Sequence, residues 1–175
     1  KAIFDELTAG LPEGIVLHAA ASSAAARYPE TRYDMVRQGI AIYGCKAGNS
    51  KIHVKPALSW HTEIVYVKKM NAGESISYGC TYTTEKDSVI ATLPVGYGDG
   101  YSRILSGKAS VLIAGKRCPV VGRVCMDQIM VDVTALDEKA THIGAPVVLL
   151  GKQGVERITA DEMAGWATTI SYDML

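Results

Sequence analysis

The sequence lacks the features that mark membrane, disulfide-stabilised or nucleic-acid-binding proteins. Its longest apolar run, residues 147–150 with their neighbours, is far shorter than the ~20 residues that span a bilayer and suits a buried strand. Its four cysteines have no Cys-x-x-Cys spacing and are few for 175 residues, which favours reduced thiols and a cytoplasmic protein. Eighteen basic residues balance eighteen acidic ones, so no basic field attracts nucleic acid or an anionic membrane.

The chain is large enough to bury roughly 70% of its unfolded surface, as one large or two small domains. It begins Lys1-Ala2-Ile3-Phe4, with no initiator methionine and no signal-peptide pattern. We therefore expect it to be part of a longer protein.

Short β-branched or apolar runs alternate with helical patterns in the first third of the chain. A helix is expected over residues 1–7, a strand over 15–17, a helix with Ser22 as its N-cap over 22–27, and two further runs over 33–37 and 40–43. This alternation is typical of a parallel α/β unit.

A polar, glycine-containing stretch at residues 44–55 separates this region from the rest, so we place domains at 1–55 and 56–175. Strands are expected at residues 61–70, 88–95, 111–113, 119–121, 129–133 and 145–150, with a hairpin turn at 114–117. Thr159 and Glu162 have capping-box spacing and predict a short helix that continues through Trp166. The second domain is therefore expected to be mostly β.

The glycines Gly96, Gly98 and Gly100 invite comparison with a dinucleotide-binding fingerprint. The third glycine falls one position early, no helical run follows, and no acidic residue lies at the expected distance. Glycines this close together more often permit a sharp bend or a close backbone approach. On this interpretation the bend directs Tyr97 outward.

Polar residues follow the first two short runs. His18 and Arg37 come at their carboxyl ends, where α/β barrels collect functional groups, although a core histidine and a surface arginine are the simpler interpretations. Ser22, and Gly39 with Ile40, stand where helices begin, and helix N-termini favour phosphate. Together they indicate a phosphate pocket.

Three further side chains bear on chemistry. Cys118 and Cys125 have no histidine or carboxylate at ligand spacing, so we expect apolar packing rather than a nucleophile or a metal site. Tyr78, between Ser77 and Gly79, is a candidate catalytic residue, because a strand-core role explains it poorly. A packing or hydrogen-bonding role is the alternative.

Several ordered motifs extend the argument to a family. They are His18-x-x-x-Ser22, Asp34-Met35-Val36-Arg37-x-Gly39-Ile40-x-x-Tyr43-Gly44, Ser77-Tyr78-Gly79-x-Thr81-Tyr82, Pro94-x-Gly96-Tyr97-x-Asp99-Gly100 and Val121-Gly122-Arg123-x-Cys125-Met126-Asp127-Gln128. With them the chain resembles the C-terminal half of bacterial alanine racemase, which uses pyridoxal 5'-phosphate. The resemblance implies the end of a (β/α)8 barrel followed by a C-terminal β-domain.

The resemblance also implies residue roles. Tyr78 matches the catalytic tyrosine, which reaches the active site of the partner subunit in a head-to-tail homodimer. The cofactor-binding positions are matched by Arg37 at the pyridine nitrogen, His18 orienting it, and Ser22, Gly39, Ile40 and Tyr172 around the phosphate. The substrate positions are matched by Met126, whose backbone N–H meets the carboxylate, and by Tyr97 and Arg103 at the entrance.

Racemisation explains these residue types. The α-proton must leave one face of the cofactor-bound amino acid and a proton must return on the other, so two acid/base groups flank the carbon. Tyr78 is expected to serve one face. Since a free phenol has a pKa of about 10, such a base needs cationic or hydrogen-bonding neighbours. Arg37 stays charged and does not protonate the pyridine nitrogen as an acid would.

Two departures and several alternatives accompany the resemblance. Ala21 replaces the usual asparagine before the phosphate serine, and the Schiff-base lysine of the family is absent, so we expect the 175-residue chain alone to be inactive. A decarboxylase on the same plan would place an acidic residue at the position of Arg37. A racemase for serine or another small amino acid, and a non-catalytic dimerisation β-domain, remain alternatives.

Overall fold

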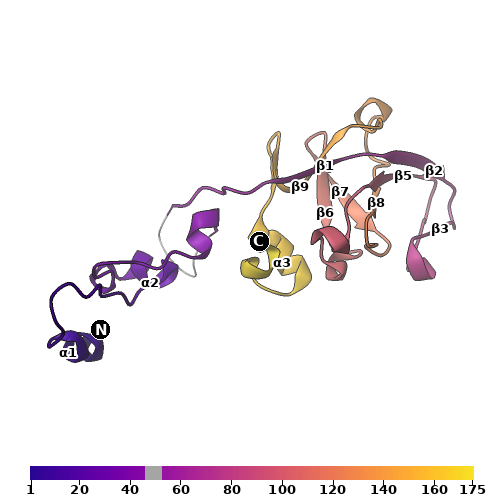
Figure 1. The fold of residues 1–175 in the computed structure, drawn as a ribbon. Helices are drawn as coiled ribbons and strands as arrows, with labels where there is room; N and C mark the ends of the chain where they lie inside the picture. The colour runs from indigo at the N-terminus through magenta and orange to yellow at the C-terminus, as the bar shows by residue number, and fades with distance from the viewer. Residues whose placement is uncertain (46–52) are drawn as a thin grey trace. The chain divides into compact units, whose positions relative to one another are not determined.

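The computed structural model describes residues 1–45 and 53–175, and the chain divides into two units, Lys1–Ala57 and Leu58–Leu175 (Figure 1). The middle of the expected boundary stretch, residues 46–52, lies outside the described residues. Among the described residues, no helix is both long and apolar enough to cross a bilayer.

The first unit contains short helices joined by extended chain. They are α1 (Ala2–Thr8), α2 (Ser22–Arg27) and two 3-10 helices, η1 (Pro29–Thr31) and η2 (Ile40–Tyr43). The expected first and second helices are confirmed, but the N-cap of α2 is Ala21 and not Ser22. Ala21 has the extended backbone of a cap, whereas Ser22 is the first helical residue, which leaves its hydroxyl for another partner.

The strand expected at residues 15–17 is wrong. In the described part of this unit the pairing is reduced to one isolated parallel bridge between Ala21 and Arg37. Two hydrogen bonds flank it, from the Asp34 N–H to the Leu17 carbonyl and from the Arg37 N–H to the Ala20 carbonyl, both 3.0 Å. A strand requires a longer ladder than these two bonds provide.

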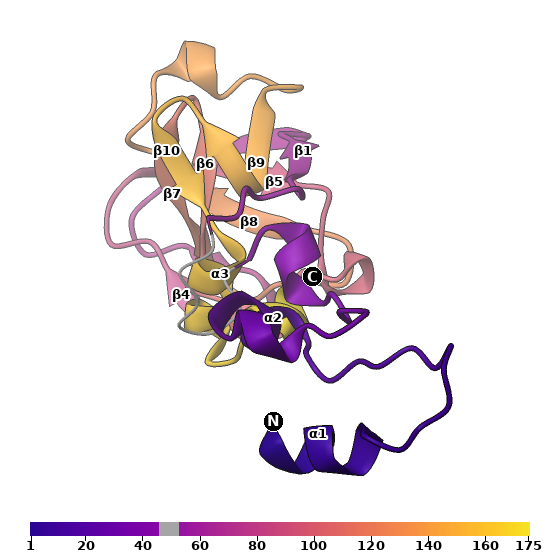
Figure 2. The ribbon, with the colours of Figure 1, turned by 90° about the vertical axis from the view of Figure 1, so that its left-hand side faces the viewer.

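In the second unit, eight of the strands among the described residues form one antiparallel sheet. They are β1 (Trp60–Glu63), β2 (Tyr66–Met70), β5 (Ser88–Leu93), β6 (Ser110–Ile113), β7 (Lys116–Val121), β8 (Ile129–Asp132), β9 (Pro146–Gln153) and β10 (Glu156–Ile158). Their order is β1-β9-β6-β7-β8-β5-β2, and β10 also pairs with β9 (Figure 2). This unit is mostly β, as the sequence predicts, and it follows the shorter first unit.

Local turn chemistry explains the β6–β7 hairpin. Ala114 and Gly115 both have positive φ, 50° and 73°, which is the type I′ geometry that matches the twist of paired strands. The run expected as one strand at residues 61–70 is instead two strands. Between them the Ile64 N–H bonds to the Ala145 carbonyl and the Val65 N–H bonds to the Thr92 carbonyl, so the chain passes from β9 to β5.

Strand β5 differs from the simple alternation that its sequence suggests. Ile90, Ala91 and Leu93 are all buried, although Ile90 and Ala91 point to opposite faces. The strand lies between β2 and β8, so both of its edges are paired, and the burial of Ile90 and Ala91 shows that both of its faces are covered. Packing on both faces therefore overrides the half-exposed pattern.

The helix α3 (Ala160–Ala167) begins as the sequence predicts, because the Thr159 hydroxyl accepts the Glu162 N–H at 3.1 Å. The Glu162 carboxylate does not complete the capping box. It binds Arg117 of β7 at 2.7 Å instead, so one residue of the helix start ties α3 to the sheet. The helix packs against two 3-10 helices, η5 (Arg103–Leu105) and η7 (Ser171–Met174).

A separate hairpin, β3 (Ser75–Ile76) with β4 (Tyr82–Thr83), carries the turn that contains Tyr78. A small apolar cluster holds this hairpin to the sheet. It consists of Met70, Ile76, Ile90 and Val121, with Tyr82 and Met130 packed against it. The residue two positions before Tyr78 is therefore anchored, while the turn itself stays at the surface.

Candidate functional site

In the first unit, two stretches lie parallel and bring His18 and Arg37 together. Nη1 of Arg37 lies 2.6 Å from Nδ1 of His18, and Nη2 donates to the Ala19 carbonyl at 3.2 Å. Since guanidinium nitrogens only donate, Nδ1 of His18 must accept. The imidazole therefore fixes the orientation of an exposed guanidinium.

The next residues of the same two stretches also meet. The hydroxyl of Ser22, at the start of α2, accepts the Gly39 N–H at 2.8 Å, and Ile40 opens η2 directly afterwards. Ser22 and Ile40 are buried, with exposed fractions of 5% and 4%. The structure thus gathers all five residues that the sequence assigns to a cofactor in this unit, with two helix starts and one fixed positive charge.

In the second unit, Tyr78 stands on a turn with unusual backbone geometry. Ser77 (φ 66°, ψ 178°), Gly79 (φ 73°) and Cys80 (φ 48°) all have positive φ. For a residue other than glycine, each such conformation costs roughly 1–3 kcal/mol and persists where surrounding contacts require it. The turn leaves the Tyr78 side chain 71% exposed.

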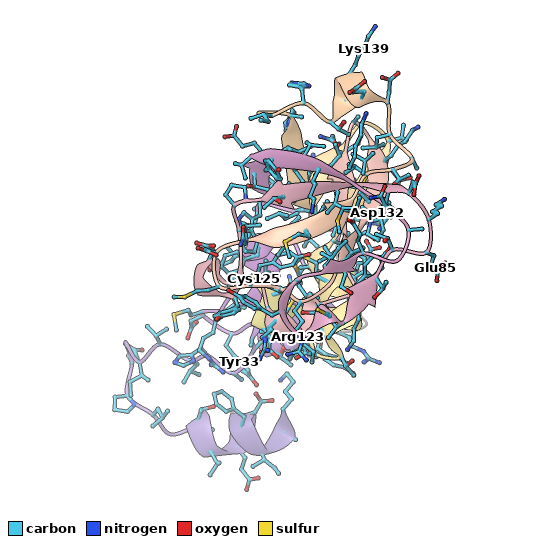
Figure 3. All side chains as sticks on the ribbon, turned by 90° about the vertical axis from the view of Figure 1, so that its right-hand side faces the viewer. Tyr33, Glu85, Arg123, Cys125, Asp132 and Lys139 are labelled. Carbon is cyan, nitrogen blue, oxygen red and sulfur yellow. The ribbon has the colours of Figure 1, made fainter. Side chains whose placement is uncertain are left out.

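One contact that holds this turn comes from the loop after β7. The Ser77 hydroxyl donates to the Arg123 carbonyl at 2.8 Å and lies 3.6 Å from Sγ of Cys125. A Cβ on Gly122 would lie 2.7 Å from Cβ of Ser77, so only glycine permits this approach. Arg123 and Cys125 lie near one another at one end of the unit, and Lys139 lies at the other (Figure 3).

The glycine-rich loop docks on the same segment. The Tyr97 N–H donates to the Cys125 carbonyl at 2.9 Å and the Gly98 N–H to the Met126 carbonyl at 2.8 Å. A Cβ on Gly96 would lie 2.3 Å from the Cys125 carbonyl oxygen. The interpretation of these glycines as a close backbone approach is confirmed, and the bend leaves Tyr97 48% exposed.

Arg103 belongs to η5, which buried Leu105 anchors. Together with Ile104, Ser106 and Arg123 it lines an open depression of about 390 Å³. Arg123 and Ser106 are residues that the sequence argument did not single out. Their positions depend on contacts between distant loops, so no local pattern marks Ser106, and Arg123 is marked only by its place inside a motif.

Met126 and Tyr172 are both exposed, by 62% and 57%. The Met126 carbonyl accepts a hydrogen bond from the Gly98 N–H. The Met126 N–H donates to no other group within the described residues. Tyr172 lies in η7, anchored by buried Ser171 against α3. No hydrogen bond among the described residues joins Tyr172 to Tyr78 or Met126.

Cys118 and Cys125 both pack inside the second unit, where their sulfurs also lie near backbone carbonyl oxygens. Cys118 and Cys125 are 3% and 5% exposed. Burial raises the pKa of the Cys118 thiol to about 11, which keeps it protonated and unreactive near neutral pH. The packing interpretation of these residues is confirmed.

Comparison with known families covers almost the whole chain. Residues 57–175 match the model of the alanine racemase C-terminal domain, and residues 1–47 match that of the alanine racemase N-terminal domain. The alanine racemase of Symbiobacterium thermophilum is 51% identical over 178 aligned residues, which cover 100% of this chain and 47% of that protein. The chain spans about half the length of the curated relatives it matches.

Solved structures agree with this fold. The alanine racemase of E. faecalis superposes with a TM-score of 0.89 and 39% identity, covering 99% of this chain and 47% of that one. The alanine racemase of Bartonella henselae, solved with covalently bound pyridoxal phosphate, superposes with a TM-score of 0.86 and 30% identity over 99% of this chain and 47% of that one.

Proposed function

The chain belongs to the alanine racemase family, and from this premise we propose that the full-length protein interconverts L-alanine and D-alanine with pyridoxal 5'-phosphate. The observation that carries the proposal is the Arg37–His18 pair beside the Ser22–Gly39 hydrogen bond. We assign residues 1–55 to the end of the barrel and residues 56–175 to the β-domain.

The residues of the first unit fit this cofactor. The proton of the Ser22 hydroxyl and the Ile40 N–H at the start of η2 would be donors for a phosphate, while the Gly39 N–H already bonds to the Ser22 oxygen. We assign Gly39 and Tyr172 to the same phosphate-binding set. The cofactor, when bound, withdraws electrons from the α-carbon of the amino acid. Arg37, oriented by His18, would donate a hydrogen bond to the ring nitrogen without giving up its proton, and so would moderate that withdrawal.

The assignment of Arg37 to the ring nitrogen distinguishes a racemase from a decarboxylase that has the same barrel and β-domain. A carboxylate at the ring nitrogen would keep that nitrogen protonated and strengthen the electron withdrawal. We assign Arg37 to that position, where a guanidinium would accept no proton from the ring nitrogen. Such an environment would favour prompt return of a proton to the α-carbon, as racemisation requires.

Tyr78 is the proposed acid/base on one face of the α-carbon. Its phenol projects from a turn whose backbone is held by Ser77, and its 71% exposure leaves it accessible to another subunit. We propose a head-to-tail homodimer in which Tyr78 enters the partner's active site. Tyr97 and Met126, on loops that hydrogen-bond to one another, are also exposed.

The loop geometry supports the proposed substrate contacts. The Met126 N–H, which has no other acceptor among the described residues, would donate to the carboxylate of the amino acid. Its peptide is oriented by the Gly98 N–H on the Met126 carbonyl. Tyr97 and Arg103 line the route to it. We further propose that the protein is cytoplasmic and that its D-alanine supplies peptidoglycan.

The test uses the full-length protein with pyridoxal 5'-phosphate and L-alanine in deuterated water. We expect D-alanine carrying α-deuterium, lost in Tyr78→Phe and retained in the control Tyr66→Phe, whose side chain is exposed on β2. Carbon dioxide release would move the assignment to a decarboxylase, and turnover of serine alone to a serine racemase. Failure to bind the cofactor would favour a non-catalytic module.

A further inference from the structure

The peptide group between Arg123 and Val124 is hydrogen-bonded by a serine hydroxyl at each of its polar atoms. The Ser77 hydroxyl donates to the Arg123 carbonyl at 2.8 Å, and the Ser106 hydroxyl accepts the Val124 N–H at 2.9 Å. The two serines come from different loops, one next to Tyr78 and one in the 3-10 turn that begins at Arg103. We call this arrangement the serine clamp.

Each serine of the clamp is tied to the loop that carries it. The Ser106 hydroxyl donates its proton to the Arg103 carbonyl at 2.6 Å, which leaves its lone pairs for the Val124 N–H. Ser77 is in a positive-φ conformation that a serine rarely adopts without an external restraint. Its bond to the Arg123 carbonyl is such a restraint, and it sets the direction in which Tyr78 leaves the hairpin.

The clamped peptide continues directly into the substrate loop. Val124 and Cys125 are buried, and the next residue, Met126, carries the N–H proposed to meet the substrate carboxylate. The clamp therefore links the acid/base at Tyr78, the entrance residue Arg103 and the carboxylate donor at Met126 through a single peptide unit. A shift of that peptide would change the spacing of all three.

We propose that Ser77 and Ser106 are positioning residues for the racemisation, an inference that rests on the proposed function. Neither hydroxyl touches the reacting atoms. Ser77 sets the approach of Tyr78 to the α-carbon, whereas Ser106 sets the placement of Arg103 relative to the substrate loop. The two serines therefore affect different kinetic quantities.

The experiment uses the full-length enzyme with cofactor and follows both enantiomers of alanine, each with hydrogen or deuterium at the α-carbon. Ser77→Ala is expected to lower kcat about 10- to 100-fold, because a displacement near 1 Å costs that much, with KM within about twofold. The primary isotope effect should rise for one enantiomer only, since Tyr78 takes the proton on one face. Ser106→Ala is expected to raise KM several-fold with a smaller change in kcat.

The matched control is Ser75→Ala, two residues before Ser77, whose exposed hydroxyl faces Thr83 at 3.3 Å and should leave kinetics unchanged. Ser77→Gly tolerates the positive φ but lacks the hydroxyl, so it should reproduce the isotope effect of Ser77→Ala. Wild-type kinetics in Ser77→Gly, or equal isotope effects for both enantiomers in Ser77→Ala, would overturn the role of the Ser77 hydroxyl.

Amide hydrogen exchange provides a readout that does not depend on activity. Ser106→Ala should accelerate exchange of the Val124 N–H while leaving the Ile129–Asp132 strand protected. Unchanged Val124 exchange would overturn the clamp even if the enzyme racemises alanine. Absence of alanine racemisation by the unsubstituted protein would instead overturn the proposed function.

Discussion

The guanidinium of Arg37 is held by the imidazole of His18, with Nη1 2.6 Å from Nδ1. The two residues lie 19 positions apart and meet because their stretches run parallel on either side of the Ala21–Arg37 bridge. A donor-only guanidinium requires an unprotonated Nδ1, so the His18 proton resides on Nε2. The pair therefore acts as one oriented donor.

Replacing His18 should weaken cofactor binding rather than folding. Loss of a hydrogen bond to a charged group is worth about 1.5–3 kcal/mol, so His18→Ala should lower the affinity for pyridoxal 5'-phosphate by roughly 10-fold or more. His18→Asn, which retains an acceptor, should recover part of it. Absorbance titration of the full-length protein measures both, with Arg27→Ala as a control in the same unit. Unchanged affinity in His18→Ala would remove the orienting role.

Gly96→Ala should destabilise the protein and disturb the substrate loop. The added Cβ would lie 2.3 Å from the Cys125 carbonyl oxygen, and relieving such a clash costs about 1–3 kcal/mol or more. Gly165→Ala in α3 is the matched control, because its Cβ would meet nothing within 4 Å. That change should stabilise by up to about 1 kcal/mol. Urea unfolding of both variants tests the contrast, which equal stabilities would contradict.

Arg117 joins β7 to β10 and α3 through Glu156 at 2.8 Å and Glu162 at 2.7 Å. It also donates to the Arg157 carbonyl at 2.7 Å. About a third of each charged side chain is exposed, so solvent screens the pairs and Arg117→Met should cost only about 1 kcal/mol.

A double-mutant cycle with Glu162→Gln should yield a coupling of about 0.5–1 kcal/mol that shrinks in high salt. Lys116→Met, at the adjacent exposed position of β7, is the control. Additive effects of Arg117→Met and Glu162→Gln would show that the pair contributes nothing to stability.

The Cys118 thiol should make stability depend on pH in the alkaline range. Burial raises its pKa from 9.0 to about 11, so the folded protein holds a proton that the unfolded chain releases. The contribution of Cys118 to the free energy of unfolding is complete below pH 9 and is lost as the pH rises through about 11. The free energy of unfolding of Cys118→Ala should therefore fall less steeply over this range.

Alkylation gives a second test of the same burial. At about pH 8 the exposed Cys80 should react first, and Cys118 only on unfolding. Mass spectrometry after iodoacetamide treatment measures the order in which the cysteines are alkylated. Reaction of Cys118 at the rate of Cys80 would contradict its placement in the core.

Two predictions that depend on neighbouring residues succeeded, whereas the predicted Ser22 N-cap of α2 did not. The β6–β7 turn requires two adjacent residues with positive φ, and the start of α3 requires Thr159 three positions before the N–H it accepts. Both are interactions within a few residues, so composition and spacing are enough to indicate them. The motifs around His18, Arg37 and Tyr78 indicate the family for the same reason, since residue order is visible in the chain.

Predictions that depend on neighbours in space did not follow from the chain. Three features depend on groups far along the sequence. They are the covering of β5 on both faces, the change of partner strand after Ile64, and the hydrogen bond between Ser22 and Gly39. The serine clamp also depends on such groups, because the Arg123–Val124 peptide is bonded at its two ends by serines that precede it by 46 and 18 positions. The sequence by itself determined which residue types are present and in what order. Only the tertiary structure decided which of them meet, because hydrogen bonding and packing act between groups that folding brings within a few ångströms of one another.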